Sequence, residues 1–104
     1  NNYFSLLQDK QLVLPFIKKD RTSVFAQFTV RSSKRENIIK HLNANGIPTA
    51  IHYPKPLHLQ KCYNNLNYKE GDFPISEIAA KEVFSLPMSP FLSDKDLTFI
   101  TSKL

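Results

Sequence analysis

The sequence predicts an α+β fold: a two-layer sandwich in which helices cover one face of a small, mainly antiparallel sheet. Three observations support this prediction. Apolar and polar residues alternate along residues 23–31, as in a half-buried strand. Several other segments carry apolar residues at helical spacing. Strand and helix signals follow one another in the order strand, helix, strand, helix, strand, helix.

The composition is that of one globular domain and argues against several other classes of protein. A chain of 104 residues with 41% hydrophobic content can bury a single modest core. The net charge of +5 is spread along the chain, so it favours anionic partners only weakly. Cys62 is the single cysteine, and we expect a packed, inert thiol in a reducing compartment. Because no apolar run reaches membrane-spanning length and no signal peptide is found, we expect a cytoplasmic protein without a membrane partner.

The N-terminal third is expected to lead into the sheet. Residues 1–8 form a short helix, and residues 11–17, which contain Pro15, form an edge strand or an extended lead-in. A charged turn over residues 18–22 connects this segment to the strand over residues 23–31. Alternation along this strand separates two faces, one with Val24, Ala26, Phe28 and Val30 and the other with Phe25, Gln27 and Thr29. The second face is either solvated or packed on another domain.

A helix is expected after this strand. Ser33 and Glu36 have the spacing of a capping box, in which two side chains bind free backbone N–H groups of the first turn. The apolar stripe of this helix consists of Ile38, Ile39 and Leu42. Gly46 supplies the left-handed residue that ends many helices. The next strand, over residues 49–52, runs directly into a loop that contains two prolines.

Two more helices and one strand are expected in the C-terminal third. Pro74 suits the first turn of a helix, and residues 83–86 form a short strand that ends before Pro87. Ser93 is expected to be the N-cap of the last helix, with acidic residues in its first turn. Ile75, Ile78, Ala79 and Glu82 share one face of the first helix, and the buried stripe of the last helix is expected to be Leu97, Ile100 and Leu104.

Residues 52–60 hold the densest set of candidate binding groups and read His-Tyr-Pro-Lys-Pro-Leu-His-Leu-Gln. Each proline disfavours helical geometry in the residue before it, so we expect a stiff, non-helical loop at a strand end. The His52 imidazole and the Tyr53 phenol can hydrogen-bond phosphate or sugar oxygens. Lys55 adds a point charge for an anion. Each residue also has a purely structural interpretation, in which His52 ends the strand, Tyr53 covers the core and Lys55 is solvated.

Other kinds of site find little support in the sequence. No pattern supplies a nucleophile, a base and an orienting acid, so no catalytic residue is assigned. His52 and His58 have no further ligand at metal spacing, which argues against a zinc site. Two glycines are too few for a phosphate-binding glycine loop. Phe25 and Phe28 are expected on opposite faces, which argues against a sheet that reads RNA.

Several short motifs follow one another in the chain. They are Gly46-Ile47-Pro48-Thr49, residues 52–60, Gly71-Asp72-Phe73-Pro74, Glu77, Ala80 and residues 83–90. In this order and at this spacing they resemble the C-terminal segment of DegT/DnrJ/StrS-type nucleotide-sugar aminotransferases, which use pyridoxal phosphate. The resemblance extends over residues 13–104, nearly the whole chain.

This resemblance implies the small C-terminal domain of an aspartate-aminotransferase-like fold in a homodimeric enzyme. Residues 1–104 would be that single domain, with residues 1–12 as the lead-in from a large domain. The enzyme would move an amino group from an amino-acid donor to the keto group of a UDP- or dTDP-linked sugar, in cell-surface polysaccharide or amino-sugar biosynthesis. His52 and Tyr53 would lie near the nucleotide-sugar phosphates, and Lys55 is the third substrate-binding candidate. The motif of the Schiff-base lysine is absent, so we expect the isolated chain to be inactive and to bind no cofactor.

Two alternatives stay open. One is a free-standing binding module for an anionic ligand or nucleic acid, which salt-dependent binding to generic DNA or RNA would support. The other is a dimerisation or scaffold domain without a ligand. The aminotransferase prediction includes no nucleic-acid partner.

Overall fold

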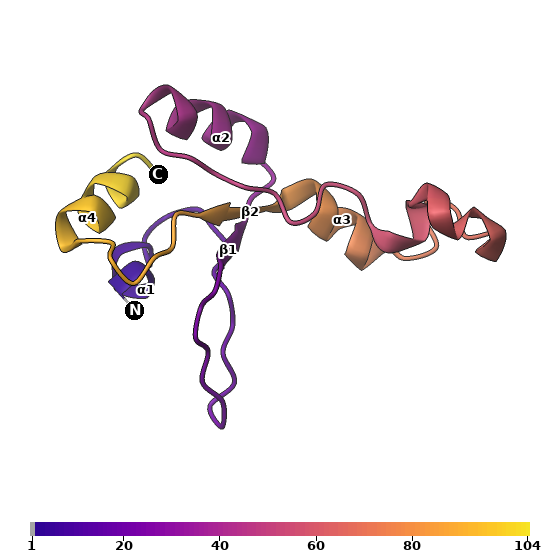
Figure 1. Ribbon diagram of the computed structural model, residues 1–104, viewed down its shortest axis with the longest axis horizontal. Coiled ribbons are helices and arrows are strands. Elements are labelled where there is room, and N and C mark those ends of the chain that lie inside the picture. Colours follow the sequence, from indigo (N-terminus) through magenta and orange to yellow (C-terminus); the bar gives the residue numbers. More distant parts are fainter. Residues whose placement is uncertain (1) are drawn as a thin grey trace.

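The computed structural model describes residues 2–104 and shows an elongated molecule around a small central sheet (Figure 1). Its extents are 49 × 38 × 24 Å. Its radius of gyration is 15.6 Å, whereas a compact domain of about 100 residues has a radius of about 13 Å. Two projections explain the difference. Residues 14–27 form a narrow first arm, and residues 53–82 form a second arm, in which helix α3 (Pro74–Glu82) lies next to the sheet.

The sheet has two antiparallel strands, β1 (Phe28–Arg31) and β2 (Val83–Leu86). Isolated bridges extend the pairing on both sides, because Val13 pairs with Arg31 and Ala50 pairs with Ser85. Thr29 lies opposite Ser85 in the sheet, and their hydroxyl oxygens are 2.9 Å apart. The α+β class and the strand over residues 83–86 are therefore confirmed.

The two other predicted strands are shorter than expected. Phe25 has a φ of 47°, and its N–H binds the Ser23 hydroxyl oxygen at 3.2 Å, so the extended chain begins only at Phe28. The Phe25 ring consequently lies 5.6 Å from the Phe28 ring instead of on the opposite face, and its predicted position was wrong. Residues 49–52 contribute the single bridge at Ala50, because Pro48 has no N–H to donate and the chain bends at His52.

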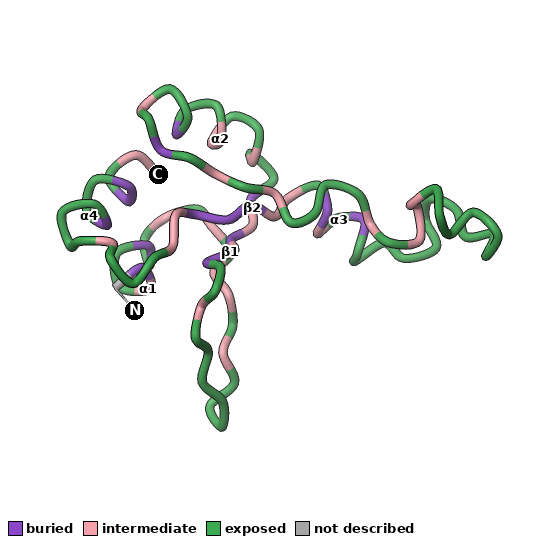
Figure 2. The backbone as a smooth tube through the Cα atoms, viewed as in Figure 1, coloured by how far each residue is buried: buried purple, intermediate pink, exposed green. Residues whose placement is uncertain are grey.

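The core lies between the sheet and three helices: α1 (Asn2–Leu6), α2 (Arg35–Ala44) and α4 (Asp94–Ser102). Its fully buried side chains are those of Tyr3, Leu7, Phe28, Val30, Leu42 and Phe84. The Tyr3 ring stacks on Phe28 at 4.8 Å, and its hydroxyl donates to the Pro87 carbonyl at 2.7 Å. Burial raises the pKa of Tyr3 to about 12. Figure 2 shows that the buried residues gather around the sheet and that both arms are largely exposed.

The ends of the helices confirm some local predictions and correct one. Gly46 has a φ of 74°, and the N–H groups of Gly46 and Ile47 bind the carbonyls of Asn43 and Leu42, the pattern of a Schellman motif. At the start of α4, Ser93 and Asp96 form a capping box. The capping box predicted from Ser33 and Glu36 is not formed. Helix α2 begins at Arg35, and the Glu36 carboxylate accepts from the Arg35 guanidinium instead.

Helix α3 begins at Pro74 as predicted, but the face that holds Ile75 and Ile78 is not the one that is buried. Its buried residues are Glu77 and Ala80, whereas Ile75 is 81% exposed. The reason is that α3 lies in the second arm, away from the core that an apolar stripe would need (Figure 1). None of the helices in residues 2–104 has the length and apolar character needed to cross a membrane.

The segment between His52 and α3 is not the open loop that the prolines predict. It contains two short 3-10 helices, η1 (Leu57–Leu59) and η2 (Lys61–Leu66). Both begin after Pro56, where the chain has an N–H at every position again. Cys62 lies in η2 and is exposed, so the prediction of a packed thiol was also wrong.

Candidate functional site

A largely apolar groove of about 590 Å³ runs along the second arm, and all three candidate residues line it. His52, Tyr53 and Lys55 come from the proline-containing loop. Aromatic and aliphatic side chains of η1, η2 and the following loop form much of the remaining wall. Helix α3 and the start of β2 contribute Ser76, Ala79, Ala80 and Val83, of which the first three are small enough to leave the groove open. The groove therefore combines a few polar groups with an apolar lining, which is typical of small-molecule sites.

The structure brings His52 and Tyr53 into contact. A cis peptide bond joins the two residues, and their rings meet edge to face with centroids 5.3 Å apart. Tyr53 is 70% exposed, so the structural interpretation in which it covers the core was wrong. Within residues 2–104, no hydrogen bond or ion pair occupies the His52 ring, the Tyr53 hydroxyl or the Lys55 ammonium. All three polar groups are therefore available to a ligand.

Lys55 is held through its backbone. The Gln60 side-chain amide donates to the Lys55 carbonyl at 3.2 Å, which closes the turn between the proline loop and η1. The Lys55 side chain itself stays exposed. Its ammonium group can therefore approach an anion in the groove while its backbone stays fixed.

Three aromatic rings form a continuous wall of the groove. The Phe73 ring meets Tyr68 edge to face at 5.0 Å and meets His58 edge to face at 4.9 Å. All three side chains line the groove. The planes of these ring pairs meet at 63° and 72°, so the wall is angled and offers ring edges and faces to a ring of a ligand.

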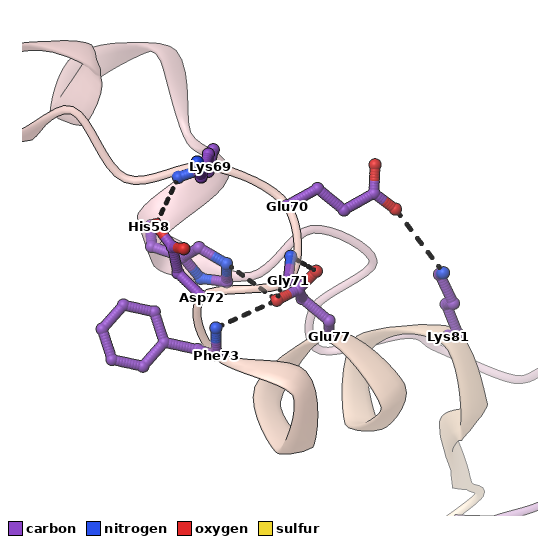
Figure 3. A network of polar contacts seen from close by, with 8 residues as sticks. All are labelled: His58, Lys69, Glu70, Gly71, Asp72, Phe73, Glu77 and Lys81. Atoms are coloured by element: carbon purple, nitrogen blue, oxygen red, sulfur yellow. Dashed lines mark hydrogen bonds and ion pairs between the residues drawn. The ribbon is translucent and has the colours of Figure 1, made fainter.

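A buried carboxylate lies behind this wall. Glu77 accepts from the Gly71 N–H at 2.8 Å and from the Phe73 N–H at 3.1 Å, and its Oε2 lies 3.3 Å from His58 Nε2 (Figure 3). The Gly71 N–H contributes most to a lowered pKa of the Glu77 carboxyl, with Phe73 and His58 acting in the same direction and burial opposing them. Glu77 is therefore ionised at neutral pH.

Glu77 and His58 both lie in the short motifs of the sequence, but no sequence pattern pairs them. One local signal could have suggested the backbone contacts. A glutamate in the first turn of a helix can reach back to free N–H groups before that helix, and Glu77 follows Pro74 by three positions. No sequence signal indicates the approach of His58, because it depends on how η1 folds back over α3.

The described residues offer no self-contained catalytic centre. Within residues 2–104, no three His, Cys, Asp or Glu side chains gather as they would around a metal ion. No lysine of this part of the chain is buried, and Lys55, the one that lines the groove, is exposed. A lysine that carries pyridoxal phosphate must be held against the cofactor carbon, and none of the described lysines is enclosed in this way. The arrangement suits binding of an anionic, ring-containing ligand.

Comparisons with known proteins agree with one another. The model of the DegT/DnrJ/EryC1/StrS aminotransferase family matches residues 1–104. A pleiotropic regulatory protein of Geobacillus stearothermophilus is 42% identical over 93 residues, which are 89% of this chain and 25% of the relative. The UDP-2-acetamido-2-deoxy-3-oxo-D-glucuronate aminotransferase of Pseudomonas aeruginosa is 40% identical over 90 residues, which are 86% of this chain and 24% of the relative.

A solved structure shows the same fold. The crystal structure of DesV from S. venezuelae, in complex with a ketimine intermediate, superposes with a TM-score of 0.93 at 35% identity. The match covers 98% of this chain and 28% of DesV. The chain thus spans about a quarter of the length of the proteins that it matches.

Proposed function

Since the chain belongs to the DegT/DnrJ/EryC1/StrS aminotransferase family, we propose that it is the small C-terminal domain of an enzyme that aminates nucleotide-linked sugars. The substrate would be a UDP- or dTDP-linked keto sugar, and an amino acid would supply the amino group. The relative from Pseudomonas aeruginosa, which is named for a UDP-linked keto sugar, supports this substrate class. We further propose that the enzyme acts in the cytoplasm as a homodimer, as the family resemblance implies.

The observation that carries this proposal is the pairing of unoccupied polar groups with an aromatic wall in one groove. His52, Tyr53 and Lys55 supply hydrogen-bond donors and a positive charge, which suit a diphosphate. The wall around Phe73 suits the base or the sugar ring of the same ligand. A nucleotide-linked sugar presents both features, so it fits the groove better than a simple anion does.

The proposed cofactor is pyridoxal phosphate, which supplies the electron sink for amino transfer. The described lysines do not fit the Schiff-base role, because none is enclosed. We therefore propose that the cofactor and its lysine belong to a segment of the enzyme outside these residues. This chain alone is then expected to form no stable Schiff base. Borohydride trapping of the cofactor on one lysine of the 104-residue chain would contradict this.

The test compares substitutions in the full-length polypeptide that carries this sequence. Lys55→Ala is expected to raise the KM for the nucleotide sugar about tenfold, the equivalent of one lost charge-assisted hydrogen bond. His52→Ala and Tyr53→Phe are expected to act in the same direction. The matched control is Lys69→Ala, because Lys69 is exposed on the same arm and does not line the groove.

Two results would contradict the proposal. Equal KM values for Lys55→Ala and Lys69→Ala would exclude Lys55 from substrate binding. Salt-dependent binding to generic DNA or RNA, with no activity toward nucleotide sugars, would support the free-standing binding module instead.

A further inference from the structure

The Glu77 carboxylate joins two segments of the second arm that are separate in the sequence. Gly71 and Phe73 belong to the turn before α3, and both donate their backbone N–H to this carboxylate. His58 belongs to η1, and its Nε2 lies 3.3 Å from Oε2. Figure 3 shows these groups converging on one carboxylate at the start of α3. Glu77 thus holds the beginning and the end of the segment that folds over α3.

The contact between His58 and Glu77 is shielded from water. The side chains of His58 and Glu77 are 7% and 10% exposed. His58 Nε2 makes no well-aligned hydrogen bond within the described residues, so the Glu77 carboxylate is the polar group that faces it. Removing the charge of Glu77 would leave a buried imidazole nitrogen and two backbone N–H groups with poorer partners. Residues 58–73 would then lose the contacts with Glu77 that hold them against α3.

Glu77 does not line the groove, but the groups that it holds do. His58 and Phe73 are in edge-to-face contact, and Phe73 contacts Tyr68 in the same way. On the other side of His58, Gln60 holds the carbonyl of Lys55. A shift of η1 would therefore move the aromatic wall and the candidate phosphate-binding lysine together.

We propose that Glu77 is a positioning residue that sets the shape of the groove for the nucleotide sugar through His58 and Phe73. This inference rests on the proposed function. It assigns a substrate-affinity role to a side chain that touches no substrate. Because Glu77 acts on the binding of the sugar nucleotide and not on the reacting atoms, its loss should change KM and leave kcat nearly unchanged.

The experiment uses Glu77→Gln in the full-length polypeptide. The matched control is Glu70→Gln, because Glu70 is exposed on the same arm and pairs with the exposed Lys81 at 3.9 Å. We expect Glu77→Gln to raise the KM for the nucleotide sugar about tenfold with kcat within about twofold. The amide hydrogens of Gly71 and Phe73 should exchange about tenfold faster, whereas those of β1 and β2 should not change.

Glu77→Asp gives a second measurement if the glutamine variant folds poorly. Aspartate keeps the charge but is one methylene shorter, so we expect a KM between those of the wild type and Glu77→Gln. A wild-type KM in both variants, with faster exchange at Gly71 and Phe73, would show that Glu77 only caps α3 and would overturn the proposal. A fall in kcat at constant KM would also overturn it. A wild-type polypeptide without aminotransferase activity would instead refute the proposed function, and this role of Glu77 with it.

Discussion

Arg35 connects the core to the second arm at the C-terminal end of α3. Its Nη1 donates to the Ala80 carbonyl at 2.6 Å and to the Val83 carbonyl at 3.3 Å. The Arg35 side chain is 11% exposed, so water screens these bonds poorly. The C-terminal end of a helix carries a partial negative charge, which the guanidinium also offsets. We therefore expect Arg35→Ala to loosen α3 from the core.

The expected magnitude follows from these contacts. A hydrogen bond from a charged group contributes about 1.5–3 kcal/mol, and the longer bond to Val83 is expected to add about 0.5–1 kcal/mol. Glu36 pairs with Arg35 at 2.9 Å, but its side chain is 77% exposed. Such an exposed pair contributes at most about 1 kcal/mol. Arg35→Ala should therefore lower the local opening free energy of α3 and β2 by about 2–4 kcal/mol.

Native-state hydrogen exchange of the amides in α3 and β2 measures this free energy directly. Glu36→Gln is the matched control, because it removes the exposed pair and leaves the bonds to Ala80 and Val83 in place. Arg35→Lys should fall between the two, since an ammonium can reach one carbonyl but lacks the planar fork. If Arg35→Ala and Glu36→Gln gave the same opening free energy, the two carbonyl contacts would not stabilise α3, and the reasoning would be refuted.

Three further predictions concern the ends of helices and the core. Gly46→Ala should destabilise the fold by about 1–2 kcal/mol in urea titrations. This cost is conformational alone, because a Cβ there would meet no atom within 4 Å and the φ of 74° is left-handed. The pKa of Tyr3, about 12 in the fold against 10.0 ordinarily, means that neutral Tyr3 stabilises the fold below pH 10 by about 3 kcal/mol. This contribution should disappear between pH 10 and 12, and Tyr3→Phe should remove that step from alkaline unfolding curves. Ser93→Ala should cost about 1 kcal/mol at pH 7. Because Ser93 lowers the pKa of Asp96 from its ordinary 3.8, that cost should shrink as the pH falls below this value and Asp96 is protonated.

The predictions that the structure confirmed depend on contacts within one or two turns. Ser93 and Asp96 satisfy each other across the first turn of α4, and Gly46 ends α2 through bonds to carbonyls of that same helix. Pro74 is favoured at the first position of a helix, so its prediction depends only on the residues that follow it. The residues that form such features are close together in the sequence, so a sequence pattern can identify them. The family resemblance, which rests on an ordered series of short motifs, was confirmed by the family model that matches residues 1–104.

The predictions that failed depend on distant partners. Periodicity correctly places Ile75 and Ile78 on a helix, but it cannot say whether another element covers them, and in residues 2–104 they remain 81% and 47% exposed. The alternation through Phe25 was broken by a backbone turn that captures its N–H on Ser23. Of the candidate site, the sequence indicated the loop with His52, Tyr53 and Lys55. The aromatic wall and its carboxylate support could not be foreseen, because they depend on contacts of His58, Gly71 and Phe73 with Glu77 of α3.

Polar contacts at both ends of α3 explain how a groove can keep its shape outside the core. The helix has 9 residues, so it is about 13 Å long at 1.5 Å per residue. Glu77 fixes the overlying segment at its N-terminal end, and Arg35 holds the carbonyls at its C-terminal end. Burial of its isoleucines contributes little, since both are exposed. Two charged side chains, one at each end, therefore determine where the lining residues of α3 stand relative to His52 and Tyr53. Apolar contacts alone would allow α3 to slide along its neighbours. Hydrogen bonds to individual N–H and carbonyl groups instead fix the position of α3 relative to the segments that it contacts. A binding site on an arm outside the core requires such a fixed position.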